Sequence, residues 1–400
     1  MPPTHPAWLE RVRRGGLLLT VLLYSSGYGS WGLFLLLITT VLDALISRRL
    51  PWARSRLDVF VAAFLAAFLI SGLLSPYRPV ALGSVGLAAV TVYVAFGSTA
   101  AALRRDPSFL RPLAVAWVAG GVGAAALGII LRRGTALPAS TQVLGQNALG
   151  TTLLIATILA VGLVIELDGL PRRLAAGCGV LLVVGLIMTY TRGAWLGVLV
   201  GGALLLAASG ARRVVAGSVA VLLIVVTGFA LVESERTALL SRAASIPDLS
   251  ANQDRLLLIR TALSIFAAHP VSGTGLNTFP LVYPSFRGPD DPNPLPLPFA
   301  HNIFVNMAAE GGALGFVTFL AVVLAGITAG WRWHRAARLG AGRAPAVIYL
   351  SAFVGAMVHQ LFDGTLLSVH LGLGMWVLLA ILSVGSSQAS EAPEGRWTSV

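Results

Sequence analysis

Arg192, Arg255, Arg260 and His301 are the side chains best suited to chemistry in this sequence, and Asn302 follows the histidine directly. Guanidinium groups bind phosphate oxygens through paired hydrogen bonds. A neutral imidazole is the usual acceptor of a proton from a hydroxyl group near neutral pH. Such residue types can bind a phosphate-bearing ligand and accept a proton from a hydroxyl group, and each also has a structural interpretation.

Arg192 lies between two apolar runs and has two interpretations. At the tip of a hairpin, an arginine can extend its charged end to the lipid headgroups. At the mouth of a membrane cavity, an ionisable group usually marks a substrate path. The position of Arg192 alone leaves both interpretations open.

Arg255 lies in a stretch that predicts an amphipathic helix near residues 252–268, ended by His269-Pro270. At about 100° per residue, one arc of this helix holds apolar side chains, namely Leu256, Ile259, Ala262, Leu263 and Phe266. Arg255 falls inside that arc and Arg260 lies at its border. A guanidinium on a buried face needs an anionic partner, which is either a ligand phosphate or the carboxylate of Asp363 or Glu310.

His301 begins an apolar run directly after a proline-rich loop at residues 284–298, which could close over a site. A histidine there is either a cap or interfacial residue, or a catalytic base. Glu310, beside Gly311-Gly312, is expected to be a structural hydrogen-bond anchor. Asp290-Asp291 lies between prolines with no histidine nearby, so a solvated turn is expected there, and no metal site is predicted.

Composition sets the class of protein that must position these residues. Hydrophobic residues make up 56% of the 400 residues and charged residues 11%, with a mean hydropathy of +0.83, whereas soluble domains carry about 25% charge. The sequence therefore predicts an all-α integral membrane protein. We expect about twelve transmembrane helices, near 16–29, 31–47, 58–74, 80–103, 112–131, 143–166, 174–190, 193–209, 213–232, 302–330, 345–362 and 366–385.

The arginines predict the orientation, because cytoplasmic connectors carry an excess of positive charge. All 28 cationic side chains are arginine, and twelve spans with a cytoplasmic N-terminus place most of them inside. The alternation of arginine-rich and arginine-poor connectors along the chain requires breaks between helices at residues 25–29 and at 191–193. The net charge of +12 is then explained by topology, and no nucleic-acid partner is needed.

The expected organisation has four parts. Residues 1–232 hold the first nine spans, and 233–301 form one large external loop that contains the amphipathic helix. Residues 302–385 hold the last three spans, and 386–400 form a cytoplasmic tail. The Arg192 turn, the external loop and the turn at Asp363 then meet at the same membrane face.

Three blocks of sequence resemble the superfamily of O-antigen ligases and Wzy-type polymerases, which are bacterial envelope glycosyltransferases. The blocks are Thr189-Tyr-Thr-Arg192-Gly-Ala-Trp-Leu-Gly197; Arg255 with Ala262-Leu263 and His269-Pro-Val-Ser-Gly-Thr-Gly-Leu-Asn-Thr-Phe279; and Tyr283-Pro284 with His301-Asn302 through Glu310-Gly311 to Gly315. A weaker match is Gly145-Gln-Asn147. Together the blocks cover about a third of the chain, and Thr191 stands where the family often has serine.

The resemblance implies a GT-C-like, metal-independent and inverting membrane transferase that uses no cofactor. Its donor is a glycan on undecaprenyl diphosphate. The family's diphosphate-binding arginines correspond to Arg192 and Arg255, and its catalytic histidine corresponds to His301. An acidic residue late in the family's chain aligns with Asp363, and Arg260 and Asn302 are expected to support the site.

Several functions share these motifs. A ligase would transfer the glycan to lipid A-core, whereas a polymerase would join repeat units on the undecaprenyl carrier. The single large external loop favours the ligase. The alternative from another functional class is a transporter of the lipid-linked glycan. A transporter is expected to place charged residues along a path that reaches both membrane faces. The ligase interpretation predicts a bacterial inner membrane location, cytoplasmic termini, a periplasmic active site and contact with membrane lipids.

Overall fold

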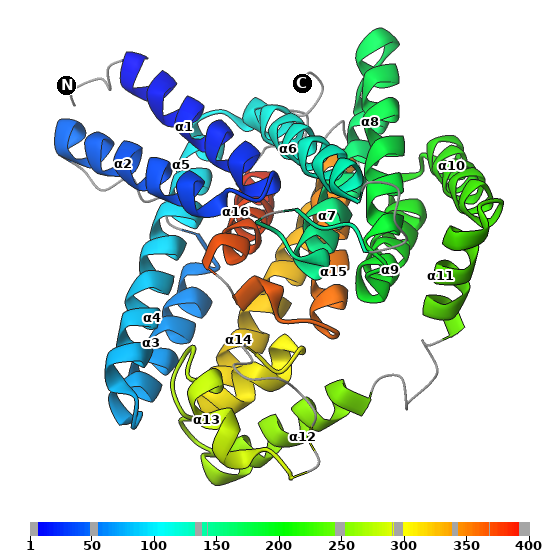
Figure 1. The fold of residues 1–400 in the computed structure, drawn as a ribbon. Helices are drawn as coiled ribbons and strands as arrows, with labels where there is room; N and C mark the ends of the chain where they lie inside the picture. Colours follow the sequence, from blue (N-terminus) through cyan, green and yellow to red (C-terminus); the bar gives the residue numbers. More distant parts are fainter. Residues whose placement is uncertain are drawn as a thin grey trace.

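The computed structural model describes residues 7–48, 55–132, 138–141, 143–244, 253–289, 291, 299–337, 343–367 and 369–391. Throughout these residues the regular secondary structure is helical, as the composition predicts (Figure 1). The two central helices are α7 (Gln146–Glu166) and α16 (Val369–Glu391), and both are deeply buried among the others. Figure 1 shows both within a ring of surrounding helices.

The remaining helices fall on the predicted apolar segments and in the external loop. They are α1 (Ala7–Ser25), α2 (Gly29–Ser47), α3 (Asp58–Leu74), α4 (Arg78–Thr91), α5 (Ser98–Arg105), α6 (Leu110–Leu131), α8 (Gly169–Met188), α9 (Arg192–Ser209), α10 (Arg212–Ala230), α11 (Glu233–Ala244), α12 (Gln253–Ala268), α13 (Phe279–Phe286), α14 (Ile303–Ala336) and α15 (Arg343–Gln360). A π-helical turn at Val92–Gly97 joins α4 to α5, and short 3-10 turns occur at Pro107–Phe109 and Thr365–Leu367.

The chain is a multi-pass membrane protein, but fewer helices qualify as spans than the twelve predicted. Each predicted segment falls on a helix, yet among the described residues eight helices are long and apolar enough to cross a membrane. A ninth arises if the bent pair Ala216–Ala230 and Glu235–Ser241 is one span. The helices α3 and α15 are short apolar helices, and α1 carries charges in its first two turns.

The two predicted breaks both exist. Residues 16–47 form two helices, because α1 ends at Ser25 and α2 begins at Gly29, with Gly27 at a φ of 99° between them. The second break lies two residues earlier than predicted, at Thr189–Thr191, where Tyr190 has a φ of 51°. Helix α9 therefore begins at Arg192 itself.

Glycines hold α9 close to α15. A methyl group added at Gly197 would meet the carbonyl oxygen of Gly355 at 2.5 Å, and one at Gly201 would meet the Ser351 carbonyl oxygen at 2.6 Å. One turn earlier, Gly193 packs against His359. Small residues at every fourth position allow two membrane helices to approach this closely. The glycines of the Arg-Gly block therefore fix the position of α9 against the helix that carries His359.

Helix α14 is longer than the predicted span and is broken. Gly312 has a φ of 60° inside the helix, and the connector after α12 enters at this break. The Ala313 amide donates to the Pro270 carbonyl at 2.8 Å, and a methyl group on Gly273 would overlap the Glu310 backbone at 2.3 Å. The break lets the connector between α12 and α13 dock directly into α14.

Glu310 is a structural anchor, as predicted. Its carboxylate accepts hydrogen bonds from the backbone amides of Asn277 and Phe279, both at 2.9 Å. Its carbonyl accepts a third bond from the Ser71 hydroxyl at 2.9 Å. The residue therefore ties the turn before α13 and the helix α3 to α14.

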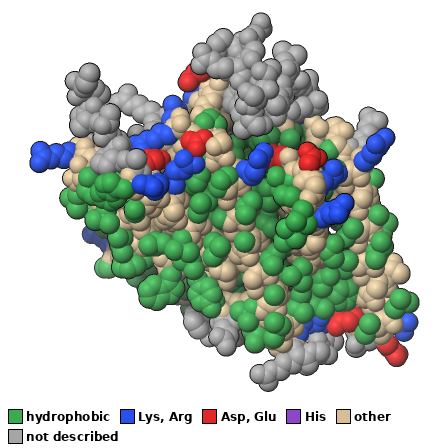
Figure 2. All heavy atoms as spheres, turned by 90° about the horizontal axis from the view of Figure 1, so that it is seen from above, with side chains coloured by type: hydrophobic (Ala, Val, Ile, Leu, Met, Phe, Trp, Pro, Cys, Tyr) green, Lys and Arg blue, Asp and Glu red, His purple; other side chains and the backbone are tan. Residues whose placement is uncertain are grey.

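The outer surface includes a wide apolar area. Figure 2 shows hydrophobic side chains covering the middle of one face, with arginines and acidic side chains along its border. Exposed apolar side chains on several of the candidate spans contribute to the surface of the molecule, including Phe34, Leu45, Leu199, Ile130 and Leu324. Such a surface fits the apolar interior of a bilayer with the charges at its boundary.

Helix α12 lies close to its predicted bounds but has a different buried face. Its buried residues are Leu258, Thr261, Ala262 and Ile265, whereas Leu256 and Leu263 of the predicted arc are 36% and 48% exposed. The buried face packs on α14 and on α13. The predicted face was wrong because some leucines of α12 are exposed. The periodicity of apolar residues therefore does not by itself identify the side of α12 that packs on α13 and α14.

Candidate active site

His301 and Asn302 stand at the entrance to α14. The Asn302 side-chain oxygen accepts hydrogen bonds from the amides of Phe304 and Val305, at 3.0 and 3.1 Å, and so caps the helix. Its amide nitrogen donates to the Leu361 carbonyl at 2.9 Å. Asn302 therefore holds the start of α14 against the end of α15, which positions its neighbour His301.

His301 itself adopts an unusual backbone conformation. Its φ is 51°, in the left-handed region that non-glycine residues seldom occupy and that occurs often at functional sites. The edge of its ring packs against Phe299, with centroids 4.9 Å apart. The side chain is 25% exposed. One edge of the imidazole therefore remains accessible while the other faces the protein.

The buried partner of His301 is Asp363. The His301 Nδ1 lies 3.7 Å from the Asp363 Oδ2, within ion-pair distance but longer than a hydrogen bond. The other carboxylate oxygen accepts a bond from the Gly364 amide at 2.7 Å. Burial opposes ionisation of Asp363, but His301, His359 and the Gly364 amide together hold its pKa below the ordinary value. The carboxylate is therefore an anion beside the imidazole at neutral pH.

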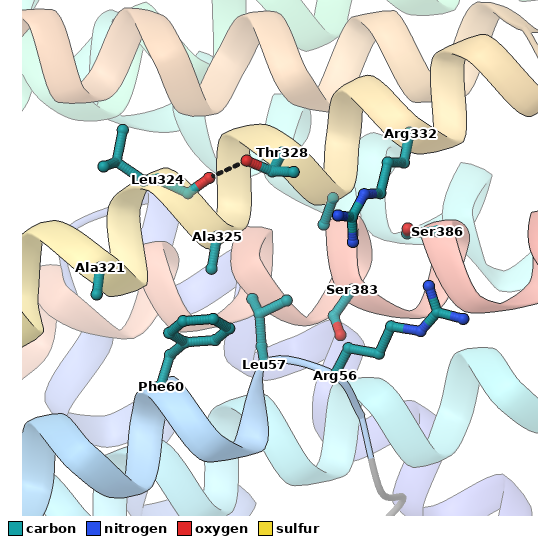
Figure 3. Close-up of a pocket in the computed structure, with 11 residues that line it drawn as sticks. Arg56, Leu57, Phe60, Ala321, Leu324, Ala325, Thr328, Arg332, Ser383 and Ser386 are labelled. Atoms are coloured by element: carbon teal, nitrogen blue, oxygen red, sulfur yellow. Dashed lines mark hydrogen bonds between the residues drawn. The ribbon is translucent and has the colours of Figure 1, made fainter.

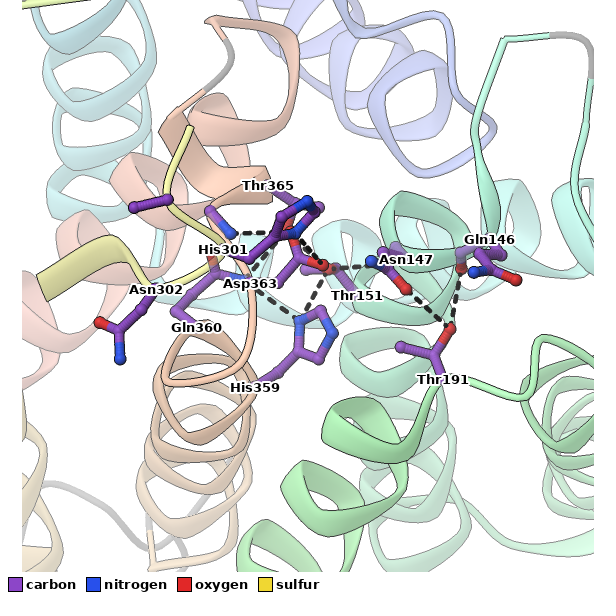
Figure 4. A network of polar contacts seen from close by, with 12 residues as sticks. Gln146, Asn147, Thr151, Thr191, His301, Asn302, His359, Gln360, Asp363 and Thr365 are labelled. Carbon is purple, nitrogen blue, oxygen red and sulfur yellow. Dashed lines mark hydrogen bonds and ion pairs between the residues drawn. The ribbon is translucent and has the colours of Figure 1, made fainter. Parts of the chain in front are cut away.

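A polar network lies beside this pair, where α7 meets the end of α15 (Figure 4). The Thr151 hydroxyl lies 3.0 Å from His359 Nδ1 and 2.9 Å from the Thr365 hydroxyl. Gln360 donates to the Thr365 hydroxyl at 2.9 Å and accepts from the Leu366 amide at 3.0 Å. These contacts fix the turn that carries Asp363. The only signal of this network in the sequence was the presence of isolated polar residues within apolar runs.

The Arg-Gly block joins the same network. The Thr191 hydroxyl donates to the Gln146 carbonyl at 3.2 Å and lies 3.5 Å from the Asn147 side-chain oxygen. Figure 4 shows Thr191 and this start of α7 beside Thr151. The weakly matched block at residues 145–147 therefore contacts the strongly matched one. Arg192 follows Thr191 directly and is half-buried at the start of α9.

Arg255 is half-buried on α12, and its positive charge acts on His359. Arg255 does not form the ion pair with Asp363 or Glu310 that was the other interpretation. Asp363 lies beside His301, and Glu310 accepts hydrogen bonds from two backbone amides. Within the described part of the chain, no carboxylate forms an ion pair with Arg255.

Arg260 was expected to support the site, but it is exposed on α12. Its carbonyl accepts a hydrogen bond from the Ser264 hydroxyl within the same helix. No contact between described residues joins the Arg260 side chain to the network around His301. One and a half turns separate it from Arg255, so the two guanidinium groups leave the helix in different directions.

A second cluster lies beside the Arg192 turn and was not predicted. Arg132 is buried and pairs with Glu235 at 2.9 Å, and it also donates to the Tyr190 hydroxyl at 3.1 Å. Burial and the hydrogen bond to Glu235 raise the pKa of Tyr190 to about 12. The cluster ties α11 to the end of α6. It holds the strained residue before Thr191 in place.

The predicted solvated turn at Asp290-Asp291 was wrong for its second residue. Asp291 is buried and accepts a hydrogen bond from the Tyr283 hydroxyl, and Asp290 lies outside the described residues. Most of the proline-rich loop, residues 292–298, also lies outside them. Across the described positions, no group of three or more His, Cys, Asp or Glu side chains is arranged to hold a metal ion.

A comparison with protein families matches the centre of this site. Residues 177–320 match the family described as O-antigen ligase. The resemblance predicted from the three blocks is confirmed over this range, which contains Arg192, Arg255, Arg260, His301 and Asn302. A comparison with curated proteins gave no match.

Asp363 and the α7 residues lie outside the matched O-antigen ligase domain. The geometry nevertheless places both against it, since Asp363 contacts His301 and Asn147 contacts Thr191. The site is therefore formed by the domain and by helices on both sides of it in sequence.

Proposed function

We propose that this protein is a membrane glycosyltransferase of the O-antigen ligase type. It transfers a glycan from undecaprenyl diphosphate to a lipid A-core acceptor at the periplasmic face of a bacterial inner membrane. The observation that supports this most directly is the pair of a partly exposed His301 and a buried, ionised Asp363, inside and beside an O-antigen ligase domain. A histidine held by a buried carboxylate is a recurrent arrangement for a general base.

His301 takes the proton from the acceptor hydroxyl as its oxygen attacks the anomeric carbon of the donor sugar. The bond between that carbon and the diphosphate oxygen breaks, and undecaprenyl diphosphate leaves with the electron pair. Asp363 stabilises the imidazolium that forms, which then releases its proton to water. A single displacement of this kind inverts the anomeric configuration.

Arg192 and Arg255 bind the diphosphate and stabilise the charge that develops on the leaving group. Arginine forks donate paired hydrogen bonds to phosphate oxygens, and donors aimed at developing charge lower the barrier. The half-buried position of both arginines supports this role, because charge interactions are stronger away from water. The expected reaction therefore proceeds in EDTA.

The first experiment is reconstitution of the purified protein with undecaprenyl-diphosphate-linked glycan and lipid A-core in EDTA. Gel mobility and product mass are the readouts. A single gain of one whole glycan by the core supports the ligase. A ladder on the undecaprenyl carrier with unchanged core would instead mean a polymerase. No product, with the lipid-linked glycan found in the other leaflet, would mean a transporter.

The His301→Ala variant tests the base directly. Loss of a general base lowers turnover by about 10²–10⁴-fold, while binding of the lipid-linked donor should remain. His269→Ala is the matched control, because His269 lies in the same domain at the end of α12. Wild-type rates of glycoside formation in the His301 variant would contradict the assigned role.

A further inference from the structure

A pocket lies at the far end of α14 from His301. It has a volume of about 330 Å³ and lies between the start of α3, the second half of α14 and the end of α16. Its lining includes Arg56, Phe60, Leu324, Arg332, Ser383 and Ser386 (Figure 3). At ~1.5 Å per residue, the helix between Ile303 and Arg332 is roughly 40 Å long. The polar end of the pocket and His301 therefore lie near opposite ends of α14.

This pocket has one polar end and one apolar end. Figure 3 shows the guanidinium groups of Arg56 and Arg332 at the same end, with Ser383 and Ser386 between them. The other end is formed by apolar side chains. Two of them, Phe60 and Leu324, are 38% and 52% exposed. The pocket therefore offers cationic and hydroxyl donors on one side and an open apolar flank on the other.

The polar end contains donors without partners. Ser383 is 1% exposed, and its hydroxyl has no hydrogen-bond partner. Thr328, by contrast, satisfies its hydroxyl by donating to the Leu324 carbonyl at 2.7 Å. Among the described residues, no carboxylate pairs with Arg56 or Arg332. A buried hydroxyl and two nearby cations without anionic partners indicate an external anion with several acceptor oxygens.

We propose that this pocket binds the phosphodiester headgroup of an anionic glycerophospholipid. Arg56 and Arg332 contact the phosphate oxygens, and the Ser383 hydroxyl donates to one of them. An acyl chain lies along Phe60 and Leu324, which face outward as a lipid chain requires. Basic pockets between membrane helices are suited to anionic headgroups. A free phosphate ion would use the polar end but would leave the apolar flank uncovered.

The test uses delipidated full-length protein in a non-ionic detergent. Thermal unfolding is followed while phosphatidylglycerol, phosphatidylcholine or inorganic phosphate is added, and each apparent affinity is taken from the shift. Phosphatidylglycerol should stabilise the wild type, whereas the other two should have little effect. Arg56→Gln with Arg332→Gln should weaken that affinity at least about tenfold, because each arginine near an anionic headgroup contributes several-fold. Ser383→Ala should weaken it less.

Arg335→Gln is the matched control, because Arg335 is an exposed arginine in the last turn of α14 but does not line the pocket. An equal loss in that control would overturn the proposal in favour of diffuse surface charge. Equal stabilisation by inorganic phosphate would overturn the lipid assignment. Unchanged affinity in the double variant would overturn the site itself.

A crosslinking experiment on the wild type keeps the proposal testable if the double variant does not fold. Phosphatidylglycerol with a photoreactive group in its acyl chain is added, and the crosslinked peptides are mapped. Crosslinks concentrated at Phe60 and Leu324 support the site. Crosslinks spread evenly over the exposed apolar residues of other helices would overturn it.

Discussion

Two arginines on the same helix have different environments, although the sequence suggested related roles. Arg255 is half-buried, and its charge acts on His359, which adjoins the network around Asp363. Arg260 is exposed, and among the described residues its side chain makes no contact with that network. The proposed diphosphate site therefore includes Arg255 and Arg192, whereas Arg260 faces away from it.

This difference predicts unequal effects of the same substitution. Arg255→Gln removes a charged donor from the leaving group, and the loss of such a donor lowers turnover by about 10²–10³-fold. Arg260→Gln serves as the control and should retain nearly the wild-type rate. The measurement is the rate of glycan transfer by purified protein in the reconstituted assay. Comparable losses in both variants would mean that α12 contributes its general charge and not one positioned guanidinium.

At the scale of the helix, much of the architecture was predictable because apolar runs and their breaks are local features. Gln253 and His269-Pro270 bound α12 as expected, and the glycines at residues 25–29 separate α1 from α2. The buried face of α12 was not predictable, because its exposed leucines have the same periodicity as a buried arc. The break in α14 was not predictable either, because it depends on the docking of the connector after α12. That contact joins segments that are distant in sequence.

The same limit applies to the candidate site. His301, Arg192 and Arg255 carry recognisable spacing, so sequence identified them. The partners Thr151 and Thr365 lie more than 200 residues apart in sequence and meet only after α7 and α15 pack. Polar residues inside apolar runs were the one available signal. That signal gives no indication of which run contacts which.

Packing between α9 and α15 gives a prediction at this scale. Gly201→Ala would place a methyl group 2.6 Å from the Ser351 carbonyl oxygen, and such overpacking costs about 1–3 kcal/mol. Gly202→Ala is the matched control, because a methyl group there meets nothing within 4 Å. Thermal unfolding in detergent should show a lower midpoint for the first variant and little change for the second. Equal midpoints would mean that the two helices separate easily.

At the scale of the whole molecule, orientation connects both proposed sites. The arginine-rich connectors at residues 48–56, 104–111 and 332–343 are predicted to be cytoplasmic. The lipid pocket, with Arg56 and Arg332, then faces the inner leaflet, and His301 faces the periplasm. A reversed orientation would leave the catalytic pair without access to a donor presented from the outer leaflet.

Cysteine labelling tests this orientation. Cys178 is the only native cysteine, so Cys178→Ser provides the background. Ser264→Cys on α12 and Ser108→Cys after α5 replace one exposed serine by cysteine at each predicted face. A membrane-impermeant maleimide added to spheroplasts should label the Ser264 variant at once and the Ser108 variant only after permeabilisation, as judged by a gel shift. The opposite pattern would place His301 in the cytoplasm, where the outer-leaflet donor cannot reach it, and would refute the proposed ligase reaction.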